Sequence, residues 1–268
     1  MKVLNLYDKN SDLRCYKKNI FKTMEIFLKH FPEEYKTCYK RNLDSLELFK
    51  VDRMDDETMT GAYNNQANVI FFEMNNSLGH ELFHVASNDL VNNIYAFESK
   101  IEIEDGLIEG MTEYLTMKAY DLTKPGSYAF EVFSVTMLED VPNIFRPYFI
   151  PNHKDFISLF PNKRDIYSLL YSLNTYNELS LDYLASTYTN KDILVDMDIL
   201  VNSIRDTFNN LIALELSMEK DNYKLKEYSD KFMDYLMSDN VRFILNELYP
   251  NYLRYAEKQI NKKVRKKR

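Results

Sequence analysis

Two histidines four positions apart, with a glutamate beside the first, are the strongest chemical signal in this sequence. His80, Glu81 and His84 belong to the run HELFH, and residues four apart on an α-helix project from the same face. Both imidazoles can therefore reach one metal ion, while Glu81 can contact a water molecule bound to that ion. The chain has only four histidines, and its composition gives about 0.004 expected matches by chance. The spacing predicts a zinc site with a carboxylate base.

A catalytic zinc site needs a third protein ligand and leaves one position for water. Residues 106–122 are predicted to form a second helix, on which Glu109 and Glu113 share one face because they are four apart. We assign Glu109 as the third ligand, with Glu113 and Glu104 as the alternatives. A ligand histidine usually donates its other N–H to a carboxylate or carbonyl, and we assign Glu113 as that acceptor. The alternative for Glu113 is a surface carboxylate on an amphipathic helix.

The hydrophobic periodicity around these segments predicts an α+β fold that is mostly helical, with a small β-sheet in the N-terminal half and a helical C-terminal half. The elements expected in the first half are helices at about 16–31, 33–42, 76–90 and 106–122 and strands at about 46–51, 61–63 and 68–73. Gly79 and Gly110 would allow the two ligand-bearing helices to approach each other closely.

The chain is expected to comprise an α+β part at residues 1–125, which holds the metal site, and a helical part at residues 126–268 packed against it, as one domain or two. Its 45% hydrophobic and 28% charged residues are typical of a globular protein. The net charge of −7 argues against nucleic acid as the main partner. The basic tail, residues 258–268, carries seven positive charges and could contact an anionic partner such as nucleic acid or anionic lipid; a solvated helix end is the alternative.

Features of targeting are missing from the sequence. Residues 1–8 lack the apolar stretch of a secretory signal, and no run of 18 apolar residues could span a membrane. Cys15 and Cys38 are the only cysteines, too few for a disulfide framework in a chain of this length. These features predict a cytoplasmic protein with no membrane span.

HELFH at residues 80–84, followed by EGMTE from Glu109 to Glu113, resembles the gluzincin branch of zinc metallopeptidases. In that zincin-like family the third ligand is a glutamate on a second helix, and a carboxylate four residues later commonly supports a ligand histidine. Glu109 and Glu113 match these two positions, and the continuation that marks the three-histidine metzincins is missing. The resemblance covers about residues 46–120.

The resemblance implies hydrolysis of peptide bonds with one Zn²⁺ ion, in which Glu81 accepts a proton from the metal-bound water and returns it to the leaving amine. A peptide or protein substrate is implied, paired along a strand by strand addition, together with a downstream Tyr or His that stabilises the oxyanion. The implied substrate strand is Asn68, Val69, Ile70 and Phe71, and the candidate oxyanion donors are His153, Tyr167 and Tyr171.

Two other classes of function stay open at this point. One is a binding or regulatory protein that keeps a structural metal and the zincin fold but lacks turnover. The other is a nucleic-acid-associated protein that uses the basic tail. The ligand types also fit Mn²⁺, Co²⁺ or Fe²⁺, and the sequence gives neither the substrate nor the choice between endopeptidase and exopeptidase.

Overall fold

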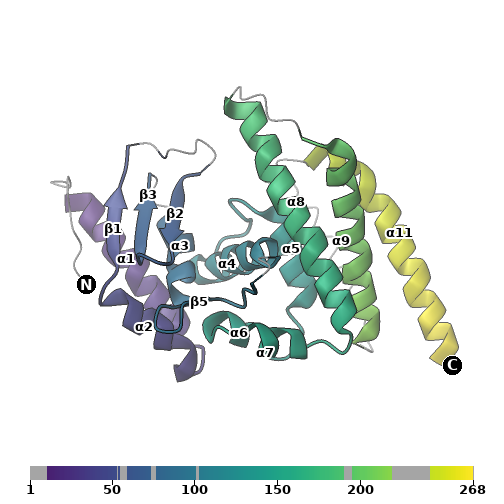
Figure 1. Ribbon diagram of the computed structural model, residues 1–268, viewed down its shortest axis with the longest axis horizontal. Coiled ribbons are helices and arrows are strands. Elements are labelled where there is room, and N and C mark those ends of the chain that lie inside the picture. Colours follow the sequence, from purple (N-terminus) through teal and green to yellow (C-terminus); the bar gives the residue numbers. More distant parts are fainter. Residues whose placement is uncertain are drawn as a thin grey trace. The chain divides into compact units, whose positions relative to one another are not determined.

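The computed structural model confirms an α+β fold that is mostly helical, with one three-stranded and one two-stranded sheet (Figure 1). It describes residues 11–52, 54, 59–73, 77–100, 103–189, 195–218 and 242–267. The chain forms two compact units. The first comprises residues 1–98, 115–123 and 145–153, and the second comprises 99–114, 124–144 and 154–268. The units interleave along the chain, which the predicted division at residue 125 did not anticipate.

The first unit begins with two helices and a 3-10 turn: α1 (Ser11–Leu28), η1 (Glu33–Lys36) and α2 (Thr37–Leu43). Met24 and Leu28 of α1 are buried, and Phe27 packs edge-on against Phe83. We predicted that the first helix would end at residue 31, but it ends at Leu28. The amides of the next three residues donate to carbonyls three positions back. The helix therefore tightens into a turn ahead of Pro32, which disfavours helical geometry in the residue before it.

The three-stranded sheet has the order β1-β3-β2, with β1 (Glu47–Lys50), β2 (Gly61–Asn64) and β3 (Val69–Phe72). Strand β3 is parallel to β1 and antiparallel to β2. Ile70 and Phe72 are fully buried, whereas Phe71 points to the opposite face and stacks on Phe49 at a centroid distance of 5.5 Å. This alternation is the period of two expected for a strand with one buried face.

The topology corrects the prediction that Asn68, Val69, Ile70 and Phe71 form the substrate strand. Strand β3 occupies the centre of the sheet and pairs with β1 on one side and β2 on the other. Its backbone groups are thus used within the sheet, and an added peptide strand would find no free edge there. Within the described sheet the edges belong to β1 and β2.

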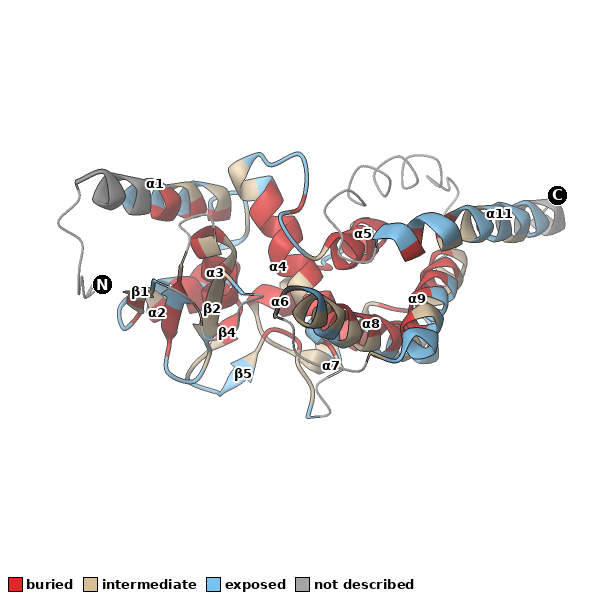
Figure 2. Ribbon diagram, turned by 90° about the horizontal axis from the view of Figure 1, so that it is seen from above, coloured by how far each residue is buried: buried red, intermediate tan, exposed pale blue. Residues whose placement is uncertain are grey.

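Helix α3 (Ser77–Ala86) carries HELFH and is followed by a two-stranded hairpin, β4 (Asn88–Asp89) and β5 (Ile94–Tyr95). The helix is almost wholly buried, as its red colouring in Figure 2 shows. We expected it to run to about residue 90. It ends earlier because Asn42 of α2 donates hydrogen bonds to the carbonyls of Val85 and Asn88, which fixes the chain in a turn at that point.

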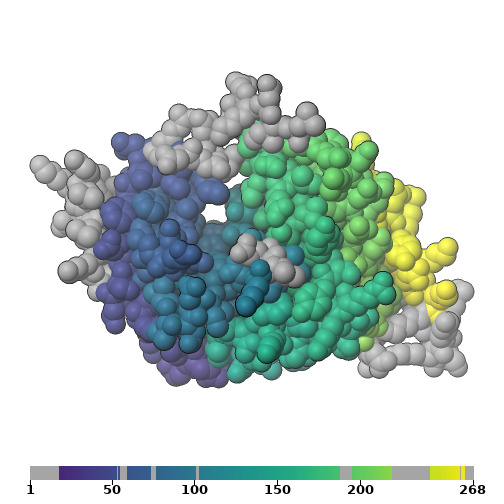
Figure 3. Space-filling view, viewed as in Figure 1, coloured from purple at the N-terminus to yellow at the C-terminus, as the bar shows by residue number. Residues whose placement is uncertain are grey.

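The other elements of the described residues are all helices. They are α4 (Asp105–Tyr120), α5 (Ala129–Leu138), α6 (Arg146–Phe149), α7 (His153–Ser158), α8 (Lys163–Thr189), α9 (Met197–Ser217) and α11 (Arg242–Lys267). In the second unit α8 and α9 lie side by side (Figures 1 and 3). Phe208 of α9 is the centre of an aromatic cluster in this unit. Its ring contacts Phe130 and Phe133 of α5 and Tyr249 and Tyr252 of α11.

Helix α11 becomes exposed towards its C-terminal end (Figure 2). Lys258 and Lys262, at the start of the predicted basic tail, are exposed. The side chains of residues 263–268 lie outside the described part of the chain. Among the helices in the described ranges, none combines the length and the apolar character that crossing a membrane requires.

Candidate metal centre

Helix α3 places the two histidine rings against each other. His80 Nε2 lies 3.1 Å from His84 Nε2, and the ring centroids are 4.8 Å apart with planes inclined at 71°. Two Zn–N bonds of about 2.0–2.1 Å at a tetrahedral angle would separate their nitrogens by roughly 3.3 Å. The pair thus has the spacing that one shared ion requires. His84 is buried and His80 is half-buried.

Glu109 completes a group of three possible ligands. Ligand atoms of His80, His84 and Glu109 all lie within 4.8 Å of one another. Among the residues that the structure describes, this is the one such group of three or more histidine, cysteine, aspartate or glutamate side chains. The donor set of two imidazoles and one carboxylate fits zinc, and it also serves other first-row divalent metals.

Glu109 lies on α4, and this helix makes close packing contacts near both of its ends. Near its start, a Cβ atom on Gly106 would lie 2.8 Å from the Leu173 carbonyl oxygen, so α8 packs directly on this glycine. Near its end, a Cβ atom on Gly79 of α3 would lie 2.8 Å from the Tyr120 ring. Tyr120 follows Glu109 by three helical turns and shares its face. Gly79 therefore makes room for a side chain of α4, while a close approach of the two helices at this residue stays a prediction.

Gly110 also permits a close approach, but to a different helix from the one we expected. A Cβ atom at Gly110 would lie 2.6 Å from the backbone oxygen of Glu131 in α5. Because Gly110 has no side chain, α5 can pack against α4 immediately beside Glu109. The expectation that Gly110 allows a close contact with α3 is thereby corrected.

Replacing Gly110 with alanine is expected to destabilise the protein by about 1–3 kcal/mol, because a backbone atom of α5 has to move. Urea denaturation of the metal-free protein measures this change. Gly126→Ala is the matched control: its Cβ atom would lie 3.5 Å from the nearest heavy atom, an ordinary contact. Equal stability of the two variants would contradict the role assigned to Gly110.

The other two glutamates considered as ligands are engaged elsewhere. Glu104 is fully buried, and its Oε2 accepts hydrogen bonds from the amides of Ser99 and Ile103. Glu113 is also buried, which excludes the alternative of a surface carboxylate, and its Oε1 accepts a 2.6 Å hydrogen bond from the Gly126 amide. Neither belongs to the group of three. That Glu113 accepts a hydrogen bond from a ligand histidine stays a prediction.

Glu81 lies on α3 next to His80 and is 5% exposed. A Cβ atom on Gly61, the first residue of β2, would lie 2.9 Å from Glu81 Oε1 and 2.9 Å from Ser77 Cβ. The carboxylate therefore occupies space that is open because residue 61 has no side chain. It is not among the three grouped ligands, as expected of a base.

The structure also identifies a residue that the sequence did not suggest. The hydroxyl of Tyr95 in β5 hydrogen-bonds to Nδ1 of His84, on the side of the ring away from His80. Tyr95 is one of 21 tyrosines and lies in no recognisable motif. Only the folding of the hairpin onto α3 reveals it.

The three candidate oxyanion donors have different surroundings. His153, the first residue of α7, has its Nδ1 3.0 Å from the carbonyl oxygen of Phe97. Tyr167 and Tyr171 lie on α8 and are 37% and 67% exposed. A role in oxyanion stabilisation stays a prediction for each of them.

Cys38 does not belong to the group of possible metal ligands. It is buried in α2, and burial, together with the Asp89 charge, raises the pKa of its thiol to about 11. The thiolate that metals bind is therefore scarce at neutral pH.

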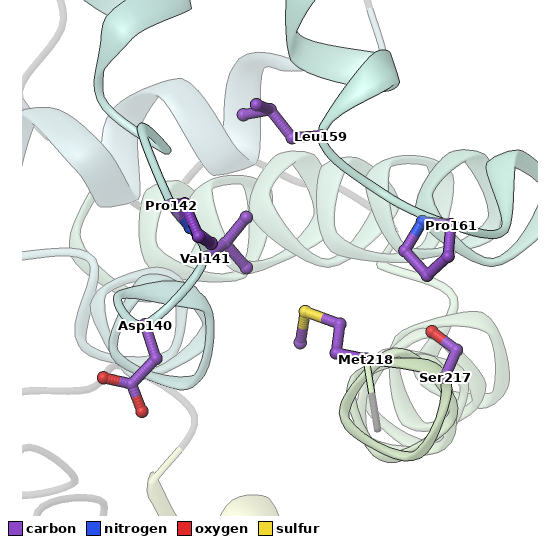
Figure 4. Close-up of a pocket in the computed structure, with 7 residues that line it drawn as sticks. All are labelled: Asp140, Val141, Pro142, Leu159, Pro161, Ser217 and Met218. Atoms are coloured by element: carbon purple, nitrogen blue, oxygen red, sulfur yellow. The ribbon is translucent and has the colours of Figure 1, made fainter. Parts of the chain in front are cut away.

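One cavity of about 480 Å³ lies in the second unit (Figure 4). It is lined by Asp140, Val141, Pro142, Leu159, Pro161, Ser217 and Met218. Val141 and Met218 face each other across it, whereas the Asp140 carboxylate points away. The lining is mainly apolar and holds no group of metal-binding side chains.

Comparison with known proteins gives no match to a protein-family model, a curated protein or a solved structure. The chemistry of the site is therefore the basis for a functional proposal.

Proposed function

We propose that this protein is a metal-dependent peptidase, with zinc as its metal and Glu81 as its general base. The observation that carries the proposal is the grouping of His80, His84 and Glu109 with a buried carboxylate on the same helix as the histidines. A structural metal needs the three ligands but has no use for Glu81. Burying an ionisable carboxylate costs free energy unless it is paired or hydrogen-bonded, so what favours a catalytic role for Glu81 is its position next to His80 in the sequence.

The ligands and Glu81 would divide the chemistry between them. His80, His84 and Glu109 would hold the ion, which when bound polarises the scissile carbonyl and makes a water molecule more acidic. Glu81 would take up the proton at a carboxylate oxygen and deliver it to the leaving amine. Its burial keeps bulk water from competing for that proton and strengthens its interactions with nearby charge.

The substrate would bind along β2 rather than β3. Strand β2 pairs with β3 on one side only within the described sheet, and its first residue, Gly61, lies beside the Glu81 carboxylate. An extended peptide paired with this edge would pass close to the general base. The substrate class proposed is therefore an extended peptide or an unfolded segment of a protein.

A peptide-library cleavage profile tests the proposal. The zinc-loaded parent protein is expected to release defined products, while the chelator-treated protein should release none. If chelation lowers the melting temperature but no peptide is cleaved under any condition, the metal is structural and the peptidase proposal fails.

Gly61→Ala gives a milder test of where the base lies. The new methyl group would press on Glu81 Oε1 and Ser77 Cβ, both 2.9 Å away, and should displace the carboxylate. We expect hydrolysis to slow by about 10-fold or more, since small misplacements of catalytic groups are costly. Zinc affinity should be unchanged, because the three atoms nearest to the new methyl group belong to Glu81 and Ser77 and not to a ligand. Unaltered turnover would contradict the placement of Glu81.

A further inference from the structure

The hairpin that follows α3 folds back onto the buried histidine. Cα atoms of Asn88 and Tyr95 are partners in the β4–β5 register, and the Ala96 amide donates a 2.7 Å hydrogen bond to the Ser87 carbonyl. This turn brings the Tyr95 ring to a centroid distance of 5.8 Å from that of His84. Tyr95 thus reaches His84 although the two residues are eleven positions apart in the sequence.

Contacts from α2 fix the hairpin in this position. Arg41 Nη2 lies 2.7 Å from Asp89 Oδ1, and Asn42 Nδ2 binds the carbonyls of Val85 and Asn88 at 2.9 and 2.7 Å. One amide thus ties the end of α3 to the start of β4. The Tyr95 hydroxyl is therefore held on a braced element rather than on a free loop.

The turn between the two strands is braced as well. Asp89 Oδ1 accepts hydrogen bonds from the amides of Val91 and Asn92. Burial raises the pKa of Asp89, but the hydrogen bonds from Asn92 and the Arg41 guanidinium outweigh it and hold that pKa below its ordinary value. The charged form that these contacts need is thereby favoured.

We infer that Tyr95 is a positioning residue for His84, an inference that rests on the proposed metal centre. In the tautomer that we assign, the hydroxyl oxygen accepts a hydrogen bond from the Nδ1–H group of His84. That proton's location leaves the lone pair on Nε2, which faces His80 Nε2 at 3.1 Å. A ligand histidine must be neutral and present this nitrogen. The phenol does so without adding a negative charge behind the ligand, as a carboxylate would.

Tyr95→Phe tests the inference because it keeps the ring and removes only the hydroxyl. Zinc affinity, measured by competition with a chelator and without substrate, is expected to fall by about 10–100-fold. Long-range ¹H–¹⁵N spectra of the metal-free protein at pH 8 report the tautomer directly. The parent should show His84 with its proton on Nδ1, and the variant should show both tautomers.

Tyr63→Phe is the matched control. The Tyr63 hydroxyl donates to Asn68 and accepts from Asn88 in the same unit, so its loss costs hydrogen bonds of the same kind. This variant should unfold more easily yet keep the parent zinc affinity and the parent His84 spectrum. If it loses as much zinc affinity as Tyr95→Phe, the effect is general destabilisation and the inference is overturned.

The remaining outcomes separate the two proposals. Parent-like affinity and spectrum in Tyr95→Phe would overturn the role of Tyr95 and leave the metal centre standing. A parent protein that binds no zinc would overturn both. A parent that binds zinc, loses it on Tyr95→Phe and cleaves no peptide would support the inference while the peptidase proposal fails.

Discussion

Glu81→Gln is expected to retain zinc, while its rate of peptide hydrolysis should fall by about 10²–10⁴-fold, which is the usual contribution of general acid–base catalysis. The amide has nearly the shape of the carboxylate, so the space beside Gly61 stays filled. It cannot, however, accept a proton at neutral pH. The ligand group of His80, His84 and Glu109 does not include this residue, and metal binding should therefore survive.

Initial rates on a peptide from the library, together with the zinc content of the purified protein, measure both halves of this result. Glu215→Gln serves as the control, because Glu215 of α9 is buried to the same extent, 5% exposed. Any fall in hydrolysis rate or zinc content in this variant is the effect of removing a buried carboxylate elsewhere in the chain. If Glu81→Gln cleaved as fast as the parent, another group would have to be the base.

Glu109→Ala is expected to remove most of the metal affinity. Loss of a residue that merely orients a ligand costs about 10–100-fold, so loss of a ligand itself should cost at least about 100-fold. At a free zinc concentration of 100 times the parent Kd, the parent should gain about 2.7 kcal/mol of stability. The variant should gain no more than about 0.4 kcal/mol under the same conditions.

Thermal or urea unfolding with and without zinc measures this difference. Asp105→Asn is the matched control, since Asp105 is an exposed carboxylate one turn earlier on the same helix. It should respond to zinc as the parent does. A zinc response in Glu109→Ala equal to that of the parent would show that a different side chain is the third ligand.

Local pattern was enough to predict most elements of the first half of the chain. The strands near residues 46–51, 61–63 and 68–73 and the helix at 106–122 appear close to where they were expected. A predicted helix boundary was wrong where a side chain distant in sequence binds the end of the helix. Helix α3 stops at Ala86 because Asn42, more than forty residues away, binds the carbonyls at its end. No local propensity encodes that contact.

Strand order was likewise invisible in the sequence. Strand β3 pairs in parallel with β1, which lies some twenty residues earlier, and this places β3 at the centre of the sheet. Alternating burial along a strand reveals which face is inward but says nothing about its neighbours. The substrate strand was consequently assigned to a segment with no free edge.

The metal site was likewise predictable from the sequence only in part. The sequence alone determined that His80 and His84 converge and that Glu109 and Glu113 share a face, because both facts follow from the 3.6-residue period of a helix. Which carboxylate joins the histidines was decided by tertiary packing. Glu109 lies in the ligand group, whereas Glu113 receives the Gly126 amide. Tyr95 reached His84 only through the hairpin, since contacts between distant segments depend on the path of the whole chain.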